Sequence, residues 1–357
     1  MAIETPEELR AHLELAVRVE LSTIPPYLYA MYSIEDQASD AAALLRSIVA
    51  EEMEHAALAA NLLTAVGGTP SFAAIDILPE YPAFLPHHRP PLLLELASAS
   101  KELIRDTFMA LERPMAPGGV FEDDEYHSLG QFYMALEDAF ERLDDEVGLF
   151  GAPRVERQLG EASFYSPVRY DEADSGGLVA VHDLDSALQA IEIIVHQGEG
   201  LGDERWADPS HQELTHYYKL RMIEQGEVDL GPVRPTVRNP RTAALPAELR
   251  PASELFNASM RYVFLILDRV YSGGGSREQL VDELYLLMTR VLAPVARALT
   301  SRAVGGGEVA GPTFERYDFG GAQPEGVLMR LGRSAVEACP ELDVVVAALE
   351  RLAPLEG

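Results

Sequence analysis

The chain has 357 residues, of which 58 are acidic and 28 basic, so its formal net charge is −30 at pH 7. Such a charge argues against nucleic acid and against an anionic membrane as partners, because both would repel the protein. Its single cysteine, Cys339, excludes an intramolecular disulfide framework and any metal cluster built on several thiolates.

The first predicted helix opens with Thr5 as its N-cap and Glu8 as the capping-box partner. An apolar stripe at helical spacing then contains Glu20; its members are Leu9, Leu13, Ala16, Glu20, Ile24, Tyr27 and Met31. Pro25 and Pro26 remove two backbone donors, which predicts a kink or break just after Glu20. A carboxylate in this stripe is either a metal ligand or a core-edge group paired with an arginine such as Arg18 or Arg46.

The second predicted helix carries a Glu-x-x-His unit, Glu52 and His55, on its buried face. Both interrupt a second apolar stripe, formed by Leu45, Ile48, Glu52, His55, Ala59, Leu62 and Val66. A buried glutamate is costly unless it is paired or binds a metal, and di-iron and di-manganese bundles use this unit twice. The short turn at 36–40 makes the two helices antiparallel, so we expect Glu20 to face Glu52.

Five prolines between residues 71 and 91 predict an extended crossover. The pattern then predicts a Leu-rich third helix over 92–112 and a fourth over 125–149, followed by irregular chain over 150–182. His87 and His88 lie in the Pro-rich crossover, where we expect them to face solvent.

A second Glu-x-x-His unit follows, with Glu213 and His216 on a helix that is predicted to start at Asp208. Glu213, His216, Leu220 and Ile223 fall on one helical face, so this pair also interrupts an apolar stripe. Two such units in register with apolar faces predict a metal site inside a helical bundle.

The sixth ligand is the least defined by the pattern. The helix predicted over 183–200 carries Glu192 and Glu199 on a polar strip, and glycines flank Glu199. We assign Glu199 as the ligand, with Glu192, or Glu112 at the end of the third helix, as alternatives. The competing interpretation is that this strip faces water.

Seven segments together resemble the ferritin-like domain of the iminophenyl-pyruvate dimer synthases, which form bisindoles in the violacein and rebeccamycin pathways, and of their stand-alone bacterial relatives. The segments are Glu20–Tyr29, Glu51–His55, Leu111–Pro114, Ser128–Tyr133, Gln197–Gly200, Glu213–Tyr218 and Ala310–Glu315. The resemblance implies a ferritin-like bundle and, for some members, oxidative coupling of two amino-acid-derived imines. It supports the fold and the site better than it supports a substrate.

The fold class expected from the whole sequence is all-α, a ferritin-like helical bundle with an additional C-terminal helical segment. We expect the bundle over residues 1–230, a linker rich in proline and arginine over 231–251, and helices over 252–271, 277–302 and 341–352 in the C-terminal segment. That segment would pack on the bundle as a lid or a dimer surface. With neither a signal peptide nor a membrane-spanning apolar run in the sequence, the expected location is the cytoplasm.

The predicted function is that of a metal-dependent oxidoreductase. Its proposed ligands are Glu20, Glu52, His55, Glu199, Glu213 and His216, which would hold one or two iron ions, although manganese or zinc would suit the same oxygen and nitrogen donors. Open coordination positions would bind dioxygen or peroxide for oxidation of a small substrate, amino-acid-derived or aromatic. The alternative is a non-catalytic metal-binding, storage or partner-binding protein.

The paired prolines also predict a pocket bounded by residues 20–32 and 52–59 that reaches the metal. Tyr27, Tyr29 and Tyr32 would give it aromatic walls, although such residues are more often plain packing.

Overall fold

The computed structural model describes residues 3–114, 126, 128–160, 177–198 and 215–355. The regular secondary structure of the described part is mostly helical, with two short antiparallel strand pairs, β1 (Ala83–Phe84) with β2 (Leu93–Leu94) and β3 (Ala303–Gly305) with β4 (Glu308–Val309). The expected all-α class is therefore confirmed. No helix in these residues is long and apolar enough to cross a membrane.

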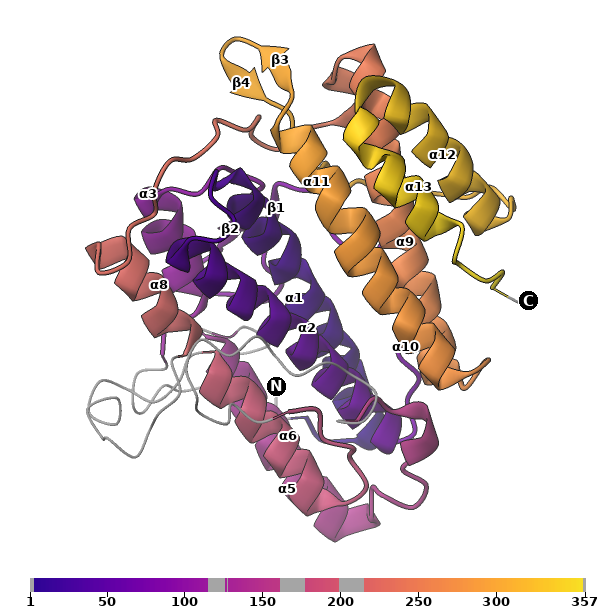
Figure 1. Ribbon diagram of the computed structural model, residues 1–357. Coiled ribbons are helices and arrows are strands. Elements are labelled where there is room, and N and C mark those ends of the chain that lie inside the picture. Colours follow the sequence, from indigo (N-terminus) through magenta and orange to yellow (C-terminus); the bar gives the residue numbers. More distant parts are fainter. Residues whose placement is uncertain (1–2, 115–125, 127, 161–176, 199–214, 356–357) are drawn as a thin grey trace.

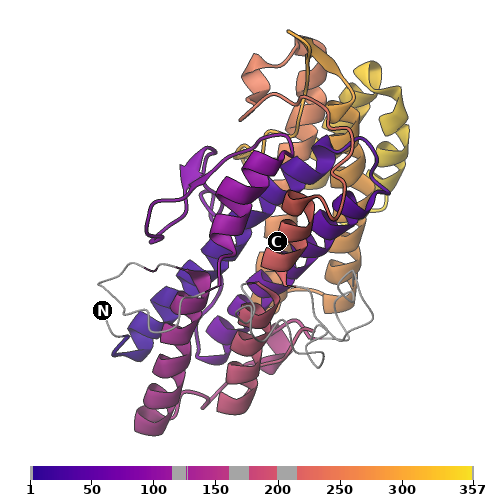
Figure 2. The same ribbon diagram turned by 90° about the vertical axis from the view of Figure 1, so that its left-hand side faces the viewer.

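Helices α1 (Pro6–Ser33) and α2 (Asp40–Ala65) form an antiparallel pair at the centre of the molecule (Figures 1 and 2). The predicted capping box at the start of α1 is present: Glu8 N–H donates to Thr5 Oγ1, and Thr5 N–H donates to Glu8 Oε2. Most residues of α2 are buried, so this pair is covered on several sides. The turn between the helices sets Glu20 and Glu52 opposite each other, as expected.

The predicted break after Glu20 is wrong, because α1 continues through Pro25 and Pro26 to Ser33. Pro26 cannot donate to the carbonyl of Ser22, which is four residues earlier. The hydroxyl of Tyr81 donates to that carbonyl at 2.7 Å instead. A side chain from the crossover thus replaces one of the two helical hydrogen bonds that the prolines remove.

Two pairs of shorter elements complete the bundle around α1 and α2. Helices α5 (Leu129–Val147) and α6 (Leu184–Gln197) pack together against one half of the central pair. Over the other half, α8 (His216–Gln225) packs against one helical stretch, made of α3 (Lys101–Leu103), the π-helical turn η1 (Ile104–Phe108) and α4 (Met109–Leu111). Glu112 directly follows α4, and His216 is the first residue of α8. Both side chains face the middle of the bundle.

The helix predicted over 92–112 begins only at Lys101, so the prediction is wrong for residues 92–100. Residues 92–100 are not helical. Leu85 N–H donates to the carbonyl of Leu92, Leu96 N–H donates to Asn239 Oδ1, and Asn239 N–H donates to the carbonyl of Leu96. Ser100 then caps the helix by accepting from Leu103 N–H. Leucine has a high helix propensity, but here pairing with a distant segment overrides it.

The C-terminal helices pack along the other side of α1 and α2 (Figure 1). They are α9 (Arg250–Ser272), the continuous stretch of α10 (Arg277–Leu286), η6 (Leu287–Leu292) and α11 (Ala293–Thr300), then α12 (Pro324–Ala338) and α13 (Asp343–Leu349). Short 3-10 turns occur at Val155–Arg157, Thr242–Ala244, Ala247–Leu249 and Pro340–Leu342. Helix α12 was not predicted, although Val327, Leu328, Leu331 and Ala335 give it an apolar stripe.

Arginines of the segment 231–251 hold it against the bundle. Arg238 forms an ion pair with Glu95, and Arg234 donates to the carbonyl of Ile34 at 3.2 Å. These contacts attach the segment to the rest of the chain, whereas the domain boundaries stay a prediction.

Candidate metal centre

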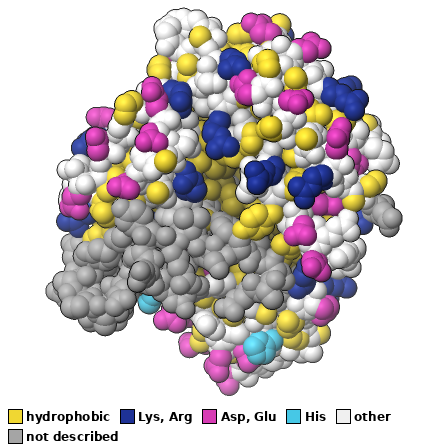
Figure 3. All heavy atoms as spheres, in the orientation of Figure 1, with side chains coloured by type: hydrophobic (Ala, Val, Ile, Leu, Met, Phe, Trp, Pro, Cys, Tyr) yellow, Lys and Arg dark blue, Asp and Glu magenta, His cyan; other side chains and the backbone are white. Residues whose placement is uncertain are grey.

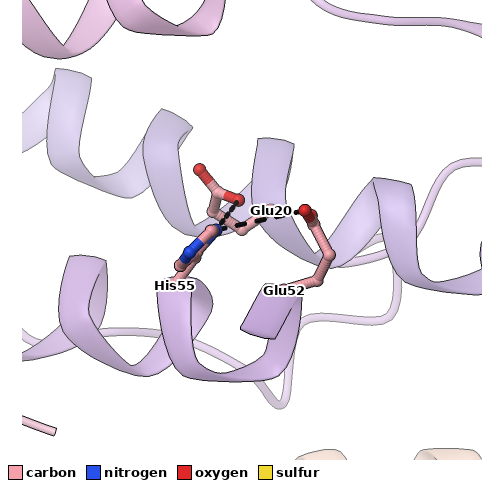
Figure 4. Close-up of side chains that lie close together, drawn as sticks. All are labelled: Glu20, Glu52 and His55. Carbon is pink, nitrogen blue, oxygen red and sulfur yellow. Dashed lines mark ion pairs between the residues drawn. The ribbon is translucent and has the colours of Figure 1, made fainter. Parts of the chain in front are cut away.

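Glu20 on α1 meets Glu52 and His55 on α2 in the centre of the bundle (Figure 4). The three side chains are at most 2% exposed. His55 Nδ1 lies 3.7 Å from Glu20 Oε2 and 4.0 Å from Glu52 Oε1. One ligand atom from each falls within 4.8 Å of the others, so the three could coordinate a common ion.

A second group shares Glu52 and adds Glu112 and His216. His216 Nδ1 lies 3.0 Å from Glu52 Oε1 and 3.5 Å from Glu112 Oε1. The two imidazole rings stack with their centroids 5.4 Å apart. Because Glu52 belongs to both groups, the five side chains could together hold one or two ions.

The outer nitrogen of each histidine is held by an acceptor outside these groups. His55 Nε2 lies 2.8 Å from Gln197 Oε1, and His216 Nε2 lies 2.9 Å from Glu51 Oε2. Since both partner atoms are acceptors, each Nε2 carries the proton when the ring is neutral, and each Nδ1 turns its lone pair toward the carboxylates. Metal-ligating histidines are oriented by outer hydrogen bonds of this kind.

Glu51 is fixed in turn by Lys219 from α8. Lys219 Nζ donates to Glu51 Oε1 at 2.7 Å and also to Oε2, and both side chains are 3% exposed. The pKa of Glu51 is lowered: burial would raise it, but the charge of Lys219 and the hydrogen bond from His216 outweigh burial. An ionised Glu51 is the strongest acceptor that His216 Nε2 can have.

Hydroxyl groups hold the three carboxylates on their outer sides. Tyr133 on α5 donates to Glu20 Oε1 at 2.5 Å, and Tyr27 on α1 donates to Glu112 Oε1 at 2.6 Å. Thr23 donates to Glu52 Oε2. Burial first, and then the adjacent carboxylates, raise the pKa of both tyrosines well above the usual value, so both stay protonated donors.

Crowding of acidic groups changes the protonation of the cluster itself. The pKa of Glu52 is raised, chiefly by burial and also by the charges of Glu112 and Glu20. Burial lowers the pKa of His216, but the neighbouring carboxylates, led by Glu112, outweigh it and raise the pKa well above the usual value. The metal-free cluster therefore retains protons that a cation would replace.

Two buried polar atoms that face this cluster lack a hydrogen bond to any described residue: Glu20 Oε2 and His216 Nδ1. A buried polar atom without a partner is costly, and a bound ion would remove that cost for both. Carboxylate oxygens and imidazole nitrogens are also the donor set that iron, manganese and zinc accept. The residues present therefore fit a metal.

The structure brings together four of the six proposed ligands, Glu20, Glu52, His55 and His216. Glu199 and Glu213, together with the predicted helix start at Asp208, lie outside the described residues. Glu112, the alternative donor, lies in the second group, whereas the side chain of Glu192 is 67% exposed and lies 3.8 Å from His196.

Glu51, Lys219 and Tyr133 were not among the residues that the sequence predicted for the site. The sequence contains one indication of a role for Lys219. The chain has only two lysines, Lys101 and Lys219, and Lys219 lies three residues after His216 on the same helical face. No signal in the pattern distinguishes Tyr133 from packing aromatics on α5.

Only one of the three tyrosines expected to line a pocket touches the cluster. Tyr29 donates to the carbonyl of Val237, away from the centre, and Tyr32 lines an apolar cavity instead. That cavity borders the predicted ranges of α1 and α2, but none of the cluster residues is among those that line it. The expected opening to the metal is thus not found in the described part of the chain.

Comparison with known proteins places this geometry in context. The sequence matches the family described as Ferritin-like over residues 13–225. The chain is 30% identical, over 87% of its length, to a 2-imino-3-(indol-3-yl)propanoate dimerase from Chromobacterium violaceum and 25% identical, over 88%, to a dichlorochromopyrrolate synthase from Lentzea aerocolonigenes. It spans 34% and 36% of those two proteins, about a third of their length.

The fold also matches a solved structure. A ferritin-like protein from Caulobacter vibrioides superposes with a TM-score of 0.62 and 25% identity, covering 83% of this chain and 96% of that one.

Proposed function

The chain belongs to the ferritin-like family, and from this premise we propose that its buried cluster is the metal centre of an oxidoreductase. The observation that carries the proposal is the orientation of His55 and His216, whose Nδ1 atoms both face carboxylates in a site closed to solvent. Among the described residues, His216 Nδ1 lies 3.0 Å from Glu52 Oε1 and Glu20 Oε2 lies 3.7 Å from His55 Nδ1, yet neither atom has a hydrogen bond. A bound ion would satisfy both atoms.

Glu20, Glu52, His55, Glu112 and His216 would hold one or two ions, and Glu213 and Glu199 are further candidates from the sequence. When bound, the metal would supply redox chemistry with dioxygen or peroxide as the oxidant. We propose iron, and manganese or zinc would suit the same donors.

The surrounding residues would prepare the site. Lys219, acting through Glu51, holds the proton of His216 on Nε2, and Gln197 does the same for His55. Tyr133 donates to Glu20 Oε1, which leaves Oε2 of that carboxylate for the ion, and Tyr27 donates to Glu112 Oε1 and fixes that carboxylate. With the carboxylates already held, ion binding needs little rearrangement of the side chains.

The proposed substrate is a small amino-acid-derived imine or a related aromatic compound, and the proposed reaction is its oxidative coupling. The support is the similarity to the dimerase and to the synthase, both of which are biosynthetic enzymes by name. Because this chain spans about a third of each, the substrate and the reaction are proposals and not consequences of family membership.

Metal analysis of protein purified without chelator tests the first step. We expect one or two ions per chain, and oxygen uptake when an aromatic imino acid is generated in the assay by an amino-acid oxidase whose own uptake is subtracted. The matched control is His216→Ala, which removes one donor. Metal bound without oxygen uptake, together with a large cage-like assembly on size exclusion, would favour the storage alternative.

A further inference from the structure

A groove of about 670 Å³ lies on the surface of the C-terminal helices. One wall is the continuous stretch of η6 and α11, and the other is α13 with the residues next to it. Three arginines and several apolar side chains line it, among them Arg290, Arg297, Arg351, Leu342 and Ala348. Figure 3 shows several Lys or Arg side chains on the part of the drawn face where Figure 1 places α11 and α13.

The three arginines of this groove carry uncompensated charge. Arg290, Arg297 and Arg351 are exposed, and none forms an ion pair or a side-chain hydrogen bond with a described residue. Glu341, the one carboxylate among the described residues that line the groove, is already paired with Arg302 at 2.6 Å. Acidic residues outnumber basic ones by 58 to 28 in this chain, so the groove presents positive charge on a strongly negative protein.

The spacing of two of these arginines restricts what can pair with both. Arg290, Pro294, Arg297 and Ser301 all line the groove, in one row with steps of four, three and four residues. Seven residues along a helix, the separation of the two arginines, correspond to about 10 Å. An occupant must therefore hold two negative groups at a similar distance, as a second helix does when its carboxylates are seven residues apart.

Helix α5 of this chain has an exposed row with the same steps. The row consists of Met134, Asp138, Glu141 and Asp145, and the two aspartates are seven residues apart. Within the described part of the chain, none of its three acidic side chains forms an ion pair. The pKa of the adjacent Glu137 is raised, first by burial and then by the charges of Glu141 and Asp138. Carboxylates on this face thus repel one another, and a positive partner would relieve the repulsion.

The row on α5 and the groove cannot meet within one chain. In both views α5 lies at the lower end of the molecule, whereas α13 lies on the opposite side in the upper half (Figures 1 and 2). A contact between them therefore requires two copies of the chain.

We propose that the groove binds helix α5 of a second copy of this chain, with Asp138 and Asp145 facing Arg290 and Arg297. Because both pairs are seven residues apart, the charges match whether the helices run parallel or antiparallel. This is the recognition of a helix in a groove by anchors at helical spacing. Each chain supplies one groove and one α5, so the contact is heterologous and can join more than two chains. The contact does not require the metal centre and goes beyond the function proposed above.

Salt provides the first test, because the contact rests on charge. Two copies with a net charge of −30 repel each other, but at about 0.1 M salt the screening length is about 10 Å, so groups in contact interact far more strongly than distant ones. Analytical ultracentrifugation of the full chain at increasing concentration should give an average mass above that of one chain. In about 1 M NaCl, where the screening length is about 3 Å, we expect monomer. Exposed ion pairs are individually weak, so association should appear only at high protein concentration.

Charge reversal identifies the groups responsible. Arg297→Glu places like charges opposite each other and should raise the dissociation constant at least about tenfold. The matched control is Arg333→Glu, at an exposed arginine of α12 that does not line the groove, and it should change nothing. Association should return when Arg297→Glu is combined with Asp138→Arg, if the helices are antiparallel, or with Asp145→Arg, if they are parallel. Combination with Glu278→Arg, at an exposed position of α10, should not restore it.

Four results would overturn the proposal. They are monomer at every concentration, association that persists in high salt, association unchanged by Arg297→Glu, or restoration by neither aspartate substitution. Monomer throughout would leave the groove to an occupant other than this chain. Every substituted side chain is exposed, and circular dichroism of each variant establishes that lost association does not reflect unfolding.

Discussion

The buried pair of Lys219 and Glu51 gives the sharpest test of how the site is held. Replacing Lys219 with methionine keeps the length of the side chain but leaves Glu51 buried, with His216 as its remaining hydrogen-bond partner among the described residues. Removing one partner of a buried ion pair typically costs about 3–5 kcal/mol, because the other charge is left uncompensated. We therefore expect Lys219→Met to lower the free energy of unfolding of the metal-free protein by about that amount.

The double variant Glu51→Leu, Lys219→Met separates lost charge compensation from lost packing. With both charges removed, the remaining defect is the unpaired Nε2–H of His216, which costs about 1–3 kcal/mol. The double variant should thus be more stable than Lys219→Met alone, or at worst equal to it. This non-additivity is the signature of direct coupling between the two side chains.

The loss should also depend on pH with a defined sign. In the folded protein the pKa of Glu51 is lowered, so its interactions stabilise the fold above the unfolded-state pKa and are lost as pH falls through the folded-state pKa. Lys219→Met removes the largest cause of that lowering. The difference between wild type and variant should accordingly be largest at neutral pH and shrink in acid.

Urea denaturation followed by circular dichroism measures these quantities. The control is Lys101→Met, at the other lysine of the chain, which is exposed. We expect this substitution to change the free energy of unfolding by no more than about 0.5 kcal/mol. A decrease in the free energy of unfolding below about 1 kcal/mol in Lys219→Met would refute the reasoning. So would a decrease in the double variant equal to the sum of the decreases in Lys219→Met and Glu51→Leu.

Three further predictions concern the metal itself. His55→Ala and His216→Ala should each lose metal and lower the melting temperature of the metal-loaded protein, measured by elemental analysis and thermal unfolding; metal content equal to wild type in both variants would end the hypothesis. Because neighbouring carboxylates raise the pKa of His216 despite its burial, a metal must displace a proton, and metal affinity should rise with pH until that pKa is passed. Calorimetry in buffers of different ionisation enthalpy should detect the released proton. No proton would be released if Nδ1 were already deprotonated in the metal-free protein. Glu112→Ala should lose more metal than Glu199→Ala, and the reverse order would restore the assignment made from sequence.

The helical stripes identified the site because burial of charge is visible in a sequence. Glu20, Glu52, His55 and His216 each interrupt a run of core positions, and each is buried in the structure. A polar residue in an apolar stripe must be compensated, so the pattern alone requires partners for it. The capping box of Thr5 and Glu8 was equally local, and it formed as predicted.

The predictions made from sequence were wrong where contacts with distant segments determine the local structure. Residues 92–100 have helical composition, yet they are not helical, and Leu96 and Ser98 pair with Asn239 and Thr236. The chain remains helical at Pro25 and Pro26, and Tyr81, 59 residues after Ser22, supplies one of the two missing hydrogen bonds. Neither partner can be read from a local window.

The sequence by itself determined the all-α class, the antiparallel central helices and four of the residues that converge in their core, because periodicity and burial are properties of single helices. Only the tertiary structure decided that Glu112 joins them, that Glu51 and Lys219 orient His216, and that the apolar cavity faces away from the cluster. These depend on how helices rotate and pack against one another, and packing is set by side chains far apart in the chain. A helical pattern therefore defines which side chains are buried, but the fold determines which buried side chains meet.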